Sequence, residues 1–341
     1  MLVACSNASQ TAAPPSPSDL PSASAGANPS PSPAPTPTPI DLPQTTVTFS
    51  CRLPIWTSNT KGAFVRFPAG TVSPDPHARG TVGSAWGLYY DRAFSRWLPV
   101  PRQSVSPDGK HFAYGVPAPD QKKLATVHVV DVATGKDHVF ATPSTDWFVP
   151  YGVLDYTSDG IYLMTNYEVS HGLALMNPQT GVIKQVADLP DIQASGGNKT
   201  FWVGTVNPAD PHPNGGMGIQ PNQIDRFNLG DRTRAEWFYR AGTSPRVVGS
   251  DAQGHPFVWA PNGRDGVIDG DYGAELLLLR SPQSPQSLFK GSAQFLGSSA
   301  TVTITDSHGT WFGTNHGIYL YTGGVLMKVS NQAGYPANGC F

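Results

Sequence analysis

Residues 45–341 are predicted to form an all-β domain, a six-bladed β-propeller, with seven blades as the alternative count. Charged residues make up only 13% of the chain, while glycine and proline number 36 and 34, a balance typical of turn-rich sheet structure. No window keeps the apolar spacing of a helix. Short β-branched and aromatic runs recur instead between turn residues, and they repeat with the period of a four-stranded unit.

The residues before this domain are predicted to form no fold of their own. Residues 1–5 end in the run Leu-Val-Ala-Cys, which closes at Cys5. Residues 6–44 are rich in proline, serine and alanine, and Asp19 and Asp41 are their only charges. Such a segment buries too little apolar surface to offset the cost of ordering, and its prolines keep it extended. We therefore expect a semi-rigid spacer ahead of the propeller.

A turn followed by a strand recurs along the domain. The turns are rich in residues that tolerate a positive φ, and their glycines stand at Gly109, Gly160, Gly197, Gly254 and Gly309, which are 37 to 57 residues apart. A unit of about 40 to 50 residues is the period of propeller blades. Counting a degraded first copy, the predicted units are 52–100, 101–144, 145–190, 191–241, 242–291 and 292–330.

Several short segments resemble known bacterial families. The Leu-Val-Ala-Cys run resembles the lipobox of lipoproteins, in which the cysteine carries the lipid. Residues 106–114 and 129–136 resemble TolB-type and WD-like propeller repeats, and residues 309–319 are similar to the repeat of two-component sensor ectodomains. These resemblances imply an exported propeller, held by lipid at Cys5 on the extracytoplasmic or cell-surface side. They imply a binding habit rather than an activity.

The lipoprotein interpretation has one gap and one alternative. A secretory signal needs a basic segment and an apolar segment, and only four residues precede Cys5, so we expect the true start to lie upstream. The alternative is a chance match of four residues.

Cysteine usage agrees with export. The chain has three cysteines, and if Cys5 is acylated then Cys51 and Cys340 are left as an even pair. An oxidising compartment permits a disulfide between them, which would clamp the two ends of the ring together. We also expect the strand-like segment Thr45–Phe49 to pair with the last blade. Two unrelated free thiols are the alternative.

Two enlarged loops are candidate ligand-binding sites, because propellers bind at the ends of the central channel. Residues 207–222 carry Asp210 and His212, and residues 261–272 carry Asn262. A structural or decorative loop is the alternative for each.

The second loop is also a candidate calcium site. Its carboxylates, Asp265, Asp269 and Asp271, are separated by residues that include glycines, an arrangement that can wrap Ca²⁺ in oxygen ligands. No glutamate follows where a twelve-residue calcium loop requires one, so ordinary Asp-Gly turns are the alternative.

Aromatic residues form the last group of candidates. Trp86 and Trp147 lie near expected loops and are candidates for stacking on a sugar or a peptide. Trp202, Trp259 and Trp311 follow strand patterns instead, and we expect them to fill the space between blades.

The absence of several sequence motifs narrows the possible classes of function. It has no Gly-x-Ser-x-Gly, His-Glu-x-x-His, phosphate-loop or zinc-finger spacing, and no catalytic residue is assigned. A net charge of −2 without a basic stripe argues against a nucleic-acid partner. No apolar run after Cys5 is long enough to span a bilayer, so the lipid is the only expected membrane contact.

We therefore expect a monomeric binding or scaffolding module at the cell envelope. Its partner would be an envelope protein, a peptide or a glycan, and its only candidate cofactor is Ca²⁺. The alternative is a propeller enzyme, a glycan or ester hydrolase or a lyase. Its acidic or histidine residues would converge on the channel mouth from distant parts of the sequence.

Overall fold

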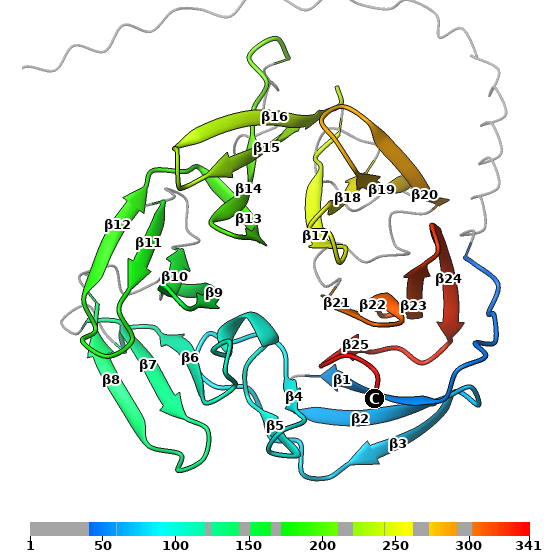
Figure 1. Cartoon of the computed structure of the whole chain (residues 1–341), viewed down its shortest axis with the longest axis horizontal. Coiled ribbons are helices and arrows are strands. Elements are labelled where there is room, and N and C mark those ends of the chain that lie inside the picture. The colour runs from blue at the N-terminus through cyan, green and yellow to red at the C-terminus, as the bar shows by residue number, and fades with distance from the viewer. Residues whose placement is uncertain are drawn as a thin grey trace, which may run out of the picture. The chain divides into compact units, whose positions relative to one another are not determined.

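The described part of the chain is a ring of antiparallel sheets. The computed structural model describes residues 41–58, 60–119, 124–142, 151–164, 172–210, 221–241, 243–261, 273–291 and 302–341. Six blades surround a common centre (Figure 1), which confirms the all-β class and the six-bladed propeller. Among these residues no helix is long and apolar enough to cross a membrane.

Each blade places one strand nearest the centre and its other strands progressively outward. Blade 1 orders β25 (Tyr335–Pro336), β1 (Cys51–Ser58), β2 (Lys61–Phe67) and β3 (Thr71–Asp75). Blade 2 has β6 (His111–Val116), β7 (Thr126–Asp131) and β8 (Asp137–Ala141), and a bridge from Val105 to Phe112 takes the inner position. A short 3-10 helix, η1 (Arg102–Ser104), precedes that bridge.

The other four blades follow in chain order, each with four strands from the inside outward. Blade 3 is β9 (Gly152–Thr157), β10 (Gly160–Met164), β11 (Leu173–Met176) and β12 (Ile183–Ala187), and blade 4 is β13 (Asp191–Gly197), β14 (Thr200–Thr205), β15 (Gln223–Asn228) and β16 (Thr233–Tyr239). Blade 5 is β17 (Arg246–Ser250), β18 (Pro256–Pro261), β19 (Ala274–Leu279) and β20 (Pro285–Gly291), and blade 6 is β21 (Val302–Asp306), β22 (Gly309–Thr314), β23 (Gly317–Thr322) and β24 (Val325–Ser330).

A two-stranded hairpin stands between blades 1 and 2. It consists of β4 (Tyr89–Asp91) and β5 (Arg96–Leu98). On one side Tyr90 joins a buried cluster with Phe64 of blade 1, and on the other Leu98 joins one with Phe112 of blade 2. The unit expected over residues 52–100 therefore divides into blade 1 and this wedge. The wedge fills an inter-blade position without being a blade, which explains why seven blades was a reasonable alternative count.

The core lies between neighbouring blades. Trp202 packs with Val258 at the junction of blades 4 and 5, and Phe257 meets Phe312 edge-on at 4.8 Å between blades 5 and 6. The tryptophans expected between blades are buried there, with 2% of Trp202 and none of Trp311 exposed. Burying one such side chain contributes about 1.5–3 kcal/mol, so each junction stabilises the ring.

The turns expected from the sequence are formed where they were predicted. Asp306 accepts a hydrogen bond from the His308 amide at 2.7 Å, which bends the chain from β21 into β22. Gly309 follows with a φ of 136°, and a Cβ at that position would lie 2.2 Å from the Tyr321 carbonyl oxygen. Only glycine fits so close to β23, which explains the repeated glycine in the pattern.

The C-terminus closes the ring. Pro336 and Tyr335 of β25 pair with Ile55 and Trp56 of β1, so the last residues of the chain complete the first blade. The expected disulfide between Cys51 and Cys340 is present, with the two Cα atoms 5.6 Å apart.

The prediction of a strand over Thr45–Phe49 is wrong. Backbone pairing with the last blade is limited to a bridge from Gln44 to Lys328 and a hydrogen bond from the Thr45 amide to the same residue. Residues 45–49 form no strand, and Val47 enters the buried cluster between blades 6 and 1 instead. The position left open in the ring was the innermost strand of blade 1, which the C-terminal residues occupy. The Asp41 carboxylate, also ahead of residue 45, accepts a hydrogen bond from the Tyr319 hydroxyl of β23 at 3.0 Å.

Antiparallel pairing gives the ring two distinct faces. We call the turn face the side where inner strands turn into second strands, and the connection face the opposite side. The links from Thr205 to Gln223 and from Pro261 to Ala274 both join a second strand to a third. The two enlarged loops therefore leave from the connection face, on the adjacent blades 4 and 5.

Candidate functional site

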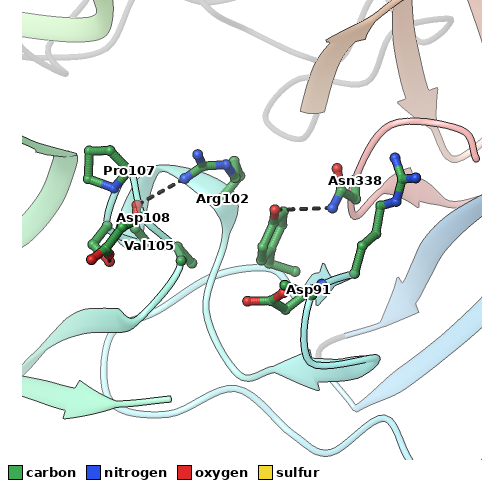
Figure 2. A pocket seen from close by; sticks show the side chains of 11 residues that line it. Asp91, Arg102, Val105, Pro107, Asp108 and Asn338 are labelled. Atoms are coloured by element: carbon green, nitrogen blue, oxygen red, sulfur yellow. Dashed lines mark hydrogen bonds between the residues drawn. The ribbon is translucent and has the colours of Figure 1, made fainter. Parts of the chain in front are cut away.

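A pocket of about 540 Å³ lies where the C-terminal tail and the β4–β5 hairpin meet blade 2. Three segments line it: the hairpin β4–β5, the turn before β6 and the tail after β25 (Figure 2). The lining residues are Tyr89, Asp91, Arg92, Ala93, Arg102, Val105, Ser106, Pro107, Asp108, Gly109 and Asn338. Most of them are polar, and charges of both signs are present.

Asn338 fixes the tail against the hairpin. Its amide nitrogen donates to the Tyr89 hydroxyl at 3.0 Å and to the Tyr90 carbonyl at 2.8 Å. The Tyr90 amide in turn donates to the Ala337 carbonyl at 2.9 Å. Burial raises the pKa of Tyr89, so its hydroxyl stays neutral near physiological pH. This wall of the pocket is therefore held by hydrogen bonds between neutral groups.

Two arginines line the pocket without a carboxylate partner. Arg102 donates one hydrogen bond to the Val105 carbonyl at 2.9 Å, and its guanidinium lies 5.5 Å from the centre of the Tyr89 ring (Figure 2). Arg92 lies 4.6 Å from the centre of the Phe341 ring. Within the described residues neither guanidinium forms an ion pair, so most of their donors remain open to a ligand.

Two aspartates supply the opposite charge. The buried Asp91 uses Oδ1 to accept from the Ala93 and Phe94 amides at 2.8 and 3.3 Å, while its Oδ2 has no partner among the described residues. Asp108 accepts from the Ser106 hydroxyl at 2.7 Å and the Lys110 amide at 3.0 Å. The Ser106 hydrogen bond is the main cause of the lowered pKa of Asp108, so this carboxylate is ionised at neutral pH.

The inner strand of blade 3 holds another unusual carboxyl group. Asp155 on β9 accepts a hydrogen bond from the Ser195 hydroxyl of β13 at 2.7 Å. Burial raises the pKa of Asp155, and the Ser195 hydrogen bond and the Arg102 charge oppose that rise. Arg102 therefore acts electrostatically on both the pocket and the inner surface of the ring.

Two of the candidate ligand-binding residues are described, and both lie outside the pocket. Trp86 is 45% exposed and packs edge-on against Trp56 at 5.0 Å, near the connection-face end of β1. Asp210 accepts hydrogen bonds from the Asn222 and Tyr239 side chains at the root of the first enlarged loop. The structure does not bring these two residues into one site.

The remaining candidates lie outside the described residues. They are Cys5, Trp147, His212, Asn262, Asp265, Asp269 and Asp271. Their roles in lipidation, ligand binding and calcium binding stay predictions. Within the described part of the chain, no group of three or more histidine, cysteine or acidic side chains is placed to hold a metal ion.

Sequence reasoning missed the pocket residues Arg92, Arg102 and Asn338. It did identify the turn at residues 106–109 that forms one wall. Tyr89 and Asn338 are 249 residues apart in the chain, so no local sequence pattern predicts their contact. The one available signal was Cys340, since a disulfide to Cys51 brings the tail back to the first blade.

Comparisons with known proteins give likenesses of structure only. No family model and no curated protein matches the sequence. TolB from Acinetobacter baumannii is 11% identical with a TM-score of 0.43, covering 87% of this chain and 68% of that one. A prolyl endopeptidase is 13% identical with a TM-score of 0.44 over 82% of this chain, which spans about half (49%) of that protein.

A putative 6-phosphogluconolactonase from Bacteroides fragilis is also similar. It is 11% identical, with a TM-score of 0.39, and the match covers 88% of this chain and all (100%) of that one. TolB is the type of propeller that residues 106–114 resemble. At these identities and scores no activity, ligand or site carries over to this chain.

Proposed function

We propose that this chain is a lipid-anchored, non-catalytic binding module at the bacterial cell envelope. The observation that carries the proposal is the pocket at the closure of the ring, with its ordered polar groups and unpaired guanidinium groups. Its volume falls within the range of about 300–1,000 Å³ that is typical of small-molecule sites. The module acts as a monomer, and its partner classes are a peptide, a glycan or an envelope protein.

The titration behaviour of the pocket supports binding rather than acid–base chemistry. A general acid or base works best with a pKa near the operating pH. The pKa of Asp108 is lowered by the Ser106 hydrogen bond, and the pKa of Tyr89 is raised by burial. Both groups are thus held in one protonation state near neutral pH, which suits a fixed surface for recognition.

Export and anchoring are supported by the cysteines. A disulfide such as Cys51–Cys340 persists in oxidising compartments and is rare in a reducing cytoplasm. Cys5 in its lipobox-like run would carry the lipid, and residues 6–44 would hold the propeller away from the membrane. Labelling with an alkyne-bearing fatty acid in a bacterial host should mark the wild type and leave Cys5→Ser unmarked. Equal labelling of both would contradict the anchor.

Binding is tested with a thermal-shift screen of the purified full chain against short peptides, glycans and soluble cell-wall fragments. One class should raise Tm for the wild type, and Arg102→Gln should lose that shift. Arg79→Gln, which changes an exposed arginine outside the pocket lining, is the matched control and should keep it. A screen without any shift, or a ligand that is consumed, would contradict the proposal.

A propeller enzyme is the second candidate function, and Asp155 favours it. A buried carboxyl group with a raised pKa is the arrangement expected of a general acid. The reaction class would be hydrolysis of a glycan or ester, or a lyase reaction. If this is the function, Asp155→Asn will abolish turnover of a ligand found in the screen while leaving its affinity nearly unchanged.

A further inference from the structure

We propose that the pocket at the ring closure binds a short peptide or amino acid through both of its charged termini. The inference rests on the proposed binding function and names the ligand class for the same site. A carboxylate would lie against Arg102, and an ammonium group would lie against the aspartates of the lining, Asp91 and Asp108.

The arginine side of the pocket suits a carboxylate. Guanidinium groups bind carboxylates through paired, charge-assisted hydrogen bonds. Arg102 donates one hydrogen bond to the Val105 carbonyl, and the Arg92 guanidinium lies over the Phe341 ring. Because neither guanidinium has an ion-pair partner within the described residues, a ligand carboxylate would not have to displace one.

The aspartate side suits an ammonium group. Asp91 offers Oδ2, which has no partner among the described residues, and the nearby Gly109 carries no side chain that would cover it. Asp108 offers Oδ2, whose nearest cation is the Lys110 ammonium at 4.0 Å. The turn at residues 106–109 and the turn after β4 thus each contribute one carboxylate to the lining.

The balance of charge selects a zwitterion over a simple ion. The described residues of the lining include two arginines and two aspartates, so a lone anion or a lone cation would meet repulsion as well as attraction. A ligand with one charge of each sign satisfies both. Tyr89 and Asn338 also line the pocket and can exchange hydrogen bonds with a peptide group.

The aromatic content of the pocket favours charged termini over a sugar. Sugars are usually held by stacking on open aromatic faces. Among the described residues of the lining Tyr89 is the only aromatic one, and the Arg102 guanidinium lies over its ring. We therefore expect a peptide in this pocket, and the test distinguishes it from a glycan.

The test is calorimetric titration of the purified full chain with trialanine. Three blocked forms accompany it: N-acetylated, C-amidated and doubly blocked. We expect trialanine to bind, each single block to weaken binding about tenfold or more, and the double block to abolish it. Affinity should also fall as salt is raised. Equal binding of free and blocked peptides, or no binding of the free peptide, would overturn the inference.

Variants assign each terminus to its side of the pocket. Arg102→Gln should weaken free trialanine about tenfold but change the C-amidated form less than about twofold, because that form has no carboxylate to lose. Asp108→Asn should likewise weaken the binding of free trialanine and change the binding of the N-acetylated form much less, because that form has no ammonium group. Arg96→Gln, on the same hairpin but outside the lining, is the control and should bind like the wild type. Identical losses for free and blocked peptides would contradict the assignment.

Failure of this inference and failure of the proposed function are separate results. If no peptide binds but a glycan or cell-wall fragment binds in an Arg102-dependent way, the ligand class is wrong and the binding function stands. If trialanine binds through its termini and is cleaved, the ligand class is right and the non-catalytic function is wrong. A circular dichroism spectrum of each variant establishes that it is folded before either conclusion is drawn.

Discussion

Individual carboxyl groups have different roles in this ring, and Asp306 has a structural role as a hydrogen-bond acceptor. Its Oδ2 accepts from the Trp311 indole at 2.8 Å and from the Cys340 amide at 2.6 Å, while Oδ1 accepts from the His308 amide. One side chain therefore joins the turn of blade 6, the buried tryptophan of β22 and the C-terminal tail.

Asp306→Ala should lower the free energy of unfolding by about 3 kcal/mol. The change leaves the Trp311 and Cys340 donors without their acceptor in a largely buried position. Urea unfolding followed by tryptophan fluorescence measures the loss. Asp231→Ala is the matched control, because that exposed aspartate bonds only within its own turn, to Thr233. Equal midpoints for the two variants would contradict the role given to Asp306.

Asp155 predicts a dependence of stability on pH. Burial raises its folded-state pKa above that of the unfolded chain, so the wild type loses stability as pH rises between the two values. Asp155→Asn removes the charge and keeps an oxygen that can accept from Ser195. The variant should therefore have the higher Tm at pH 7 and the same Tm as the wild type in acid, below both pKa values.

The opposite sign is expected at Asp231. Its hydrogen bond from Thr233 lowers the pKa, so Asp231→Asn should be less stable than the wild type at pH 7 and should converge with it in acid. Differential scanning calorimetry between pH 3 and pH 8 on both variants checks the pair. An Asp155→Asn variant that is less stable at neutral pH would show that the Arg102 attraction outweighs burial.

At the scale of elements, the disulfide replaces a turn. In blades 3 to 6 a short turn joins the inner strand to the second strand, whereas in blade 1 these strands come from opposite ends of the chain. Cys51 starts β1 and Cys340 lies in the tail that runs beside it, with Arg52 and Phe341 exchanging backbone hydrogen bonds. The covalent bond therefore stands where the other blades have their turns.

Cys340→Ser should lower the free energy of unfolding by about 3–5 kcal/mol, because the bond closes a loop with a sequence separation of 289 residues. Urea unfolding with and without reductant measures it. The wild type should lose stability in reductant, and the variant should not respond. A wild type that unfolds at the same midpoint in both conditions would refute the role of the disulfide.

How far the sequence predicts each element depends on how local its cause is. The turn at Gly309 follows from its own residues, because glycine is required wherever a strand passes within reach of a Cβ. The hairpin β4–β5 reads as part of a blade, since its strands have ordinary β patterns and only packing reveals the wedge. The tail strand β25 is two residues long and has no pattern to detect. The pocket depends on that tail, so it was not predictable either.

At the scale of the whole molecule, both the closed ring and the candidate site depend on the C-terminal tail. The C-terminal tail supplies the inner strand of blade 1, the second half of the disulfide and one wall of the pocket. Closure of the ring thus creates the site, and a ring that opens would lose both stability and binding.

Deletion of residues 335–341 should be more harmful than Cys340→Ser. The deletion removes β25 as well as the bond, uncovering the edge of β1 and the Trp56 ring that stacks on Tyr335 at 4.4 Å. We expect a further loss of several kcal/mol and increased binding of a hydrophobic dye. Denaturant unfolding of both variants under reducing conditions checks this. Equal midpoints would mean that the disulfide alone closes the ring.

Binding at the ring closure is tested most directly by calorimetric titration of the full chain with soluble cell-wall peptides, followed by mass spectrometry of the recovered ligand. A non-catalytic binding module should bind saturably, lose affinity in Arg102→Gln but not in Arg96→Gln, and leave the ligand unchanged. Binding that is indifferent to Arg102, or recovery of a cleaved ligand, would contradict a non-catalytic module that recognises its partner where the ring closes.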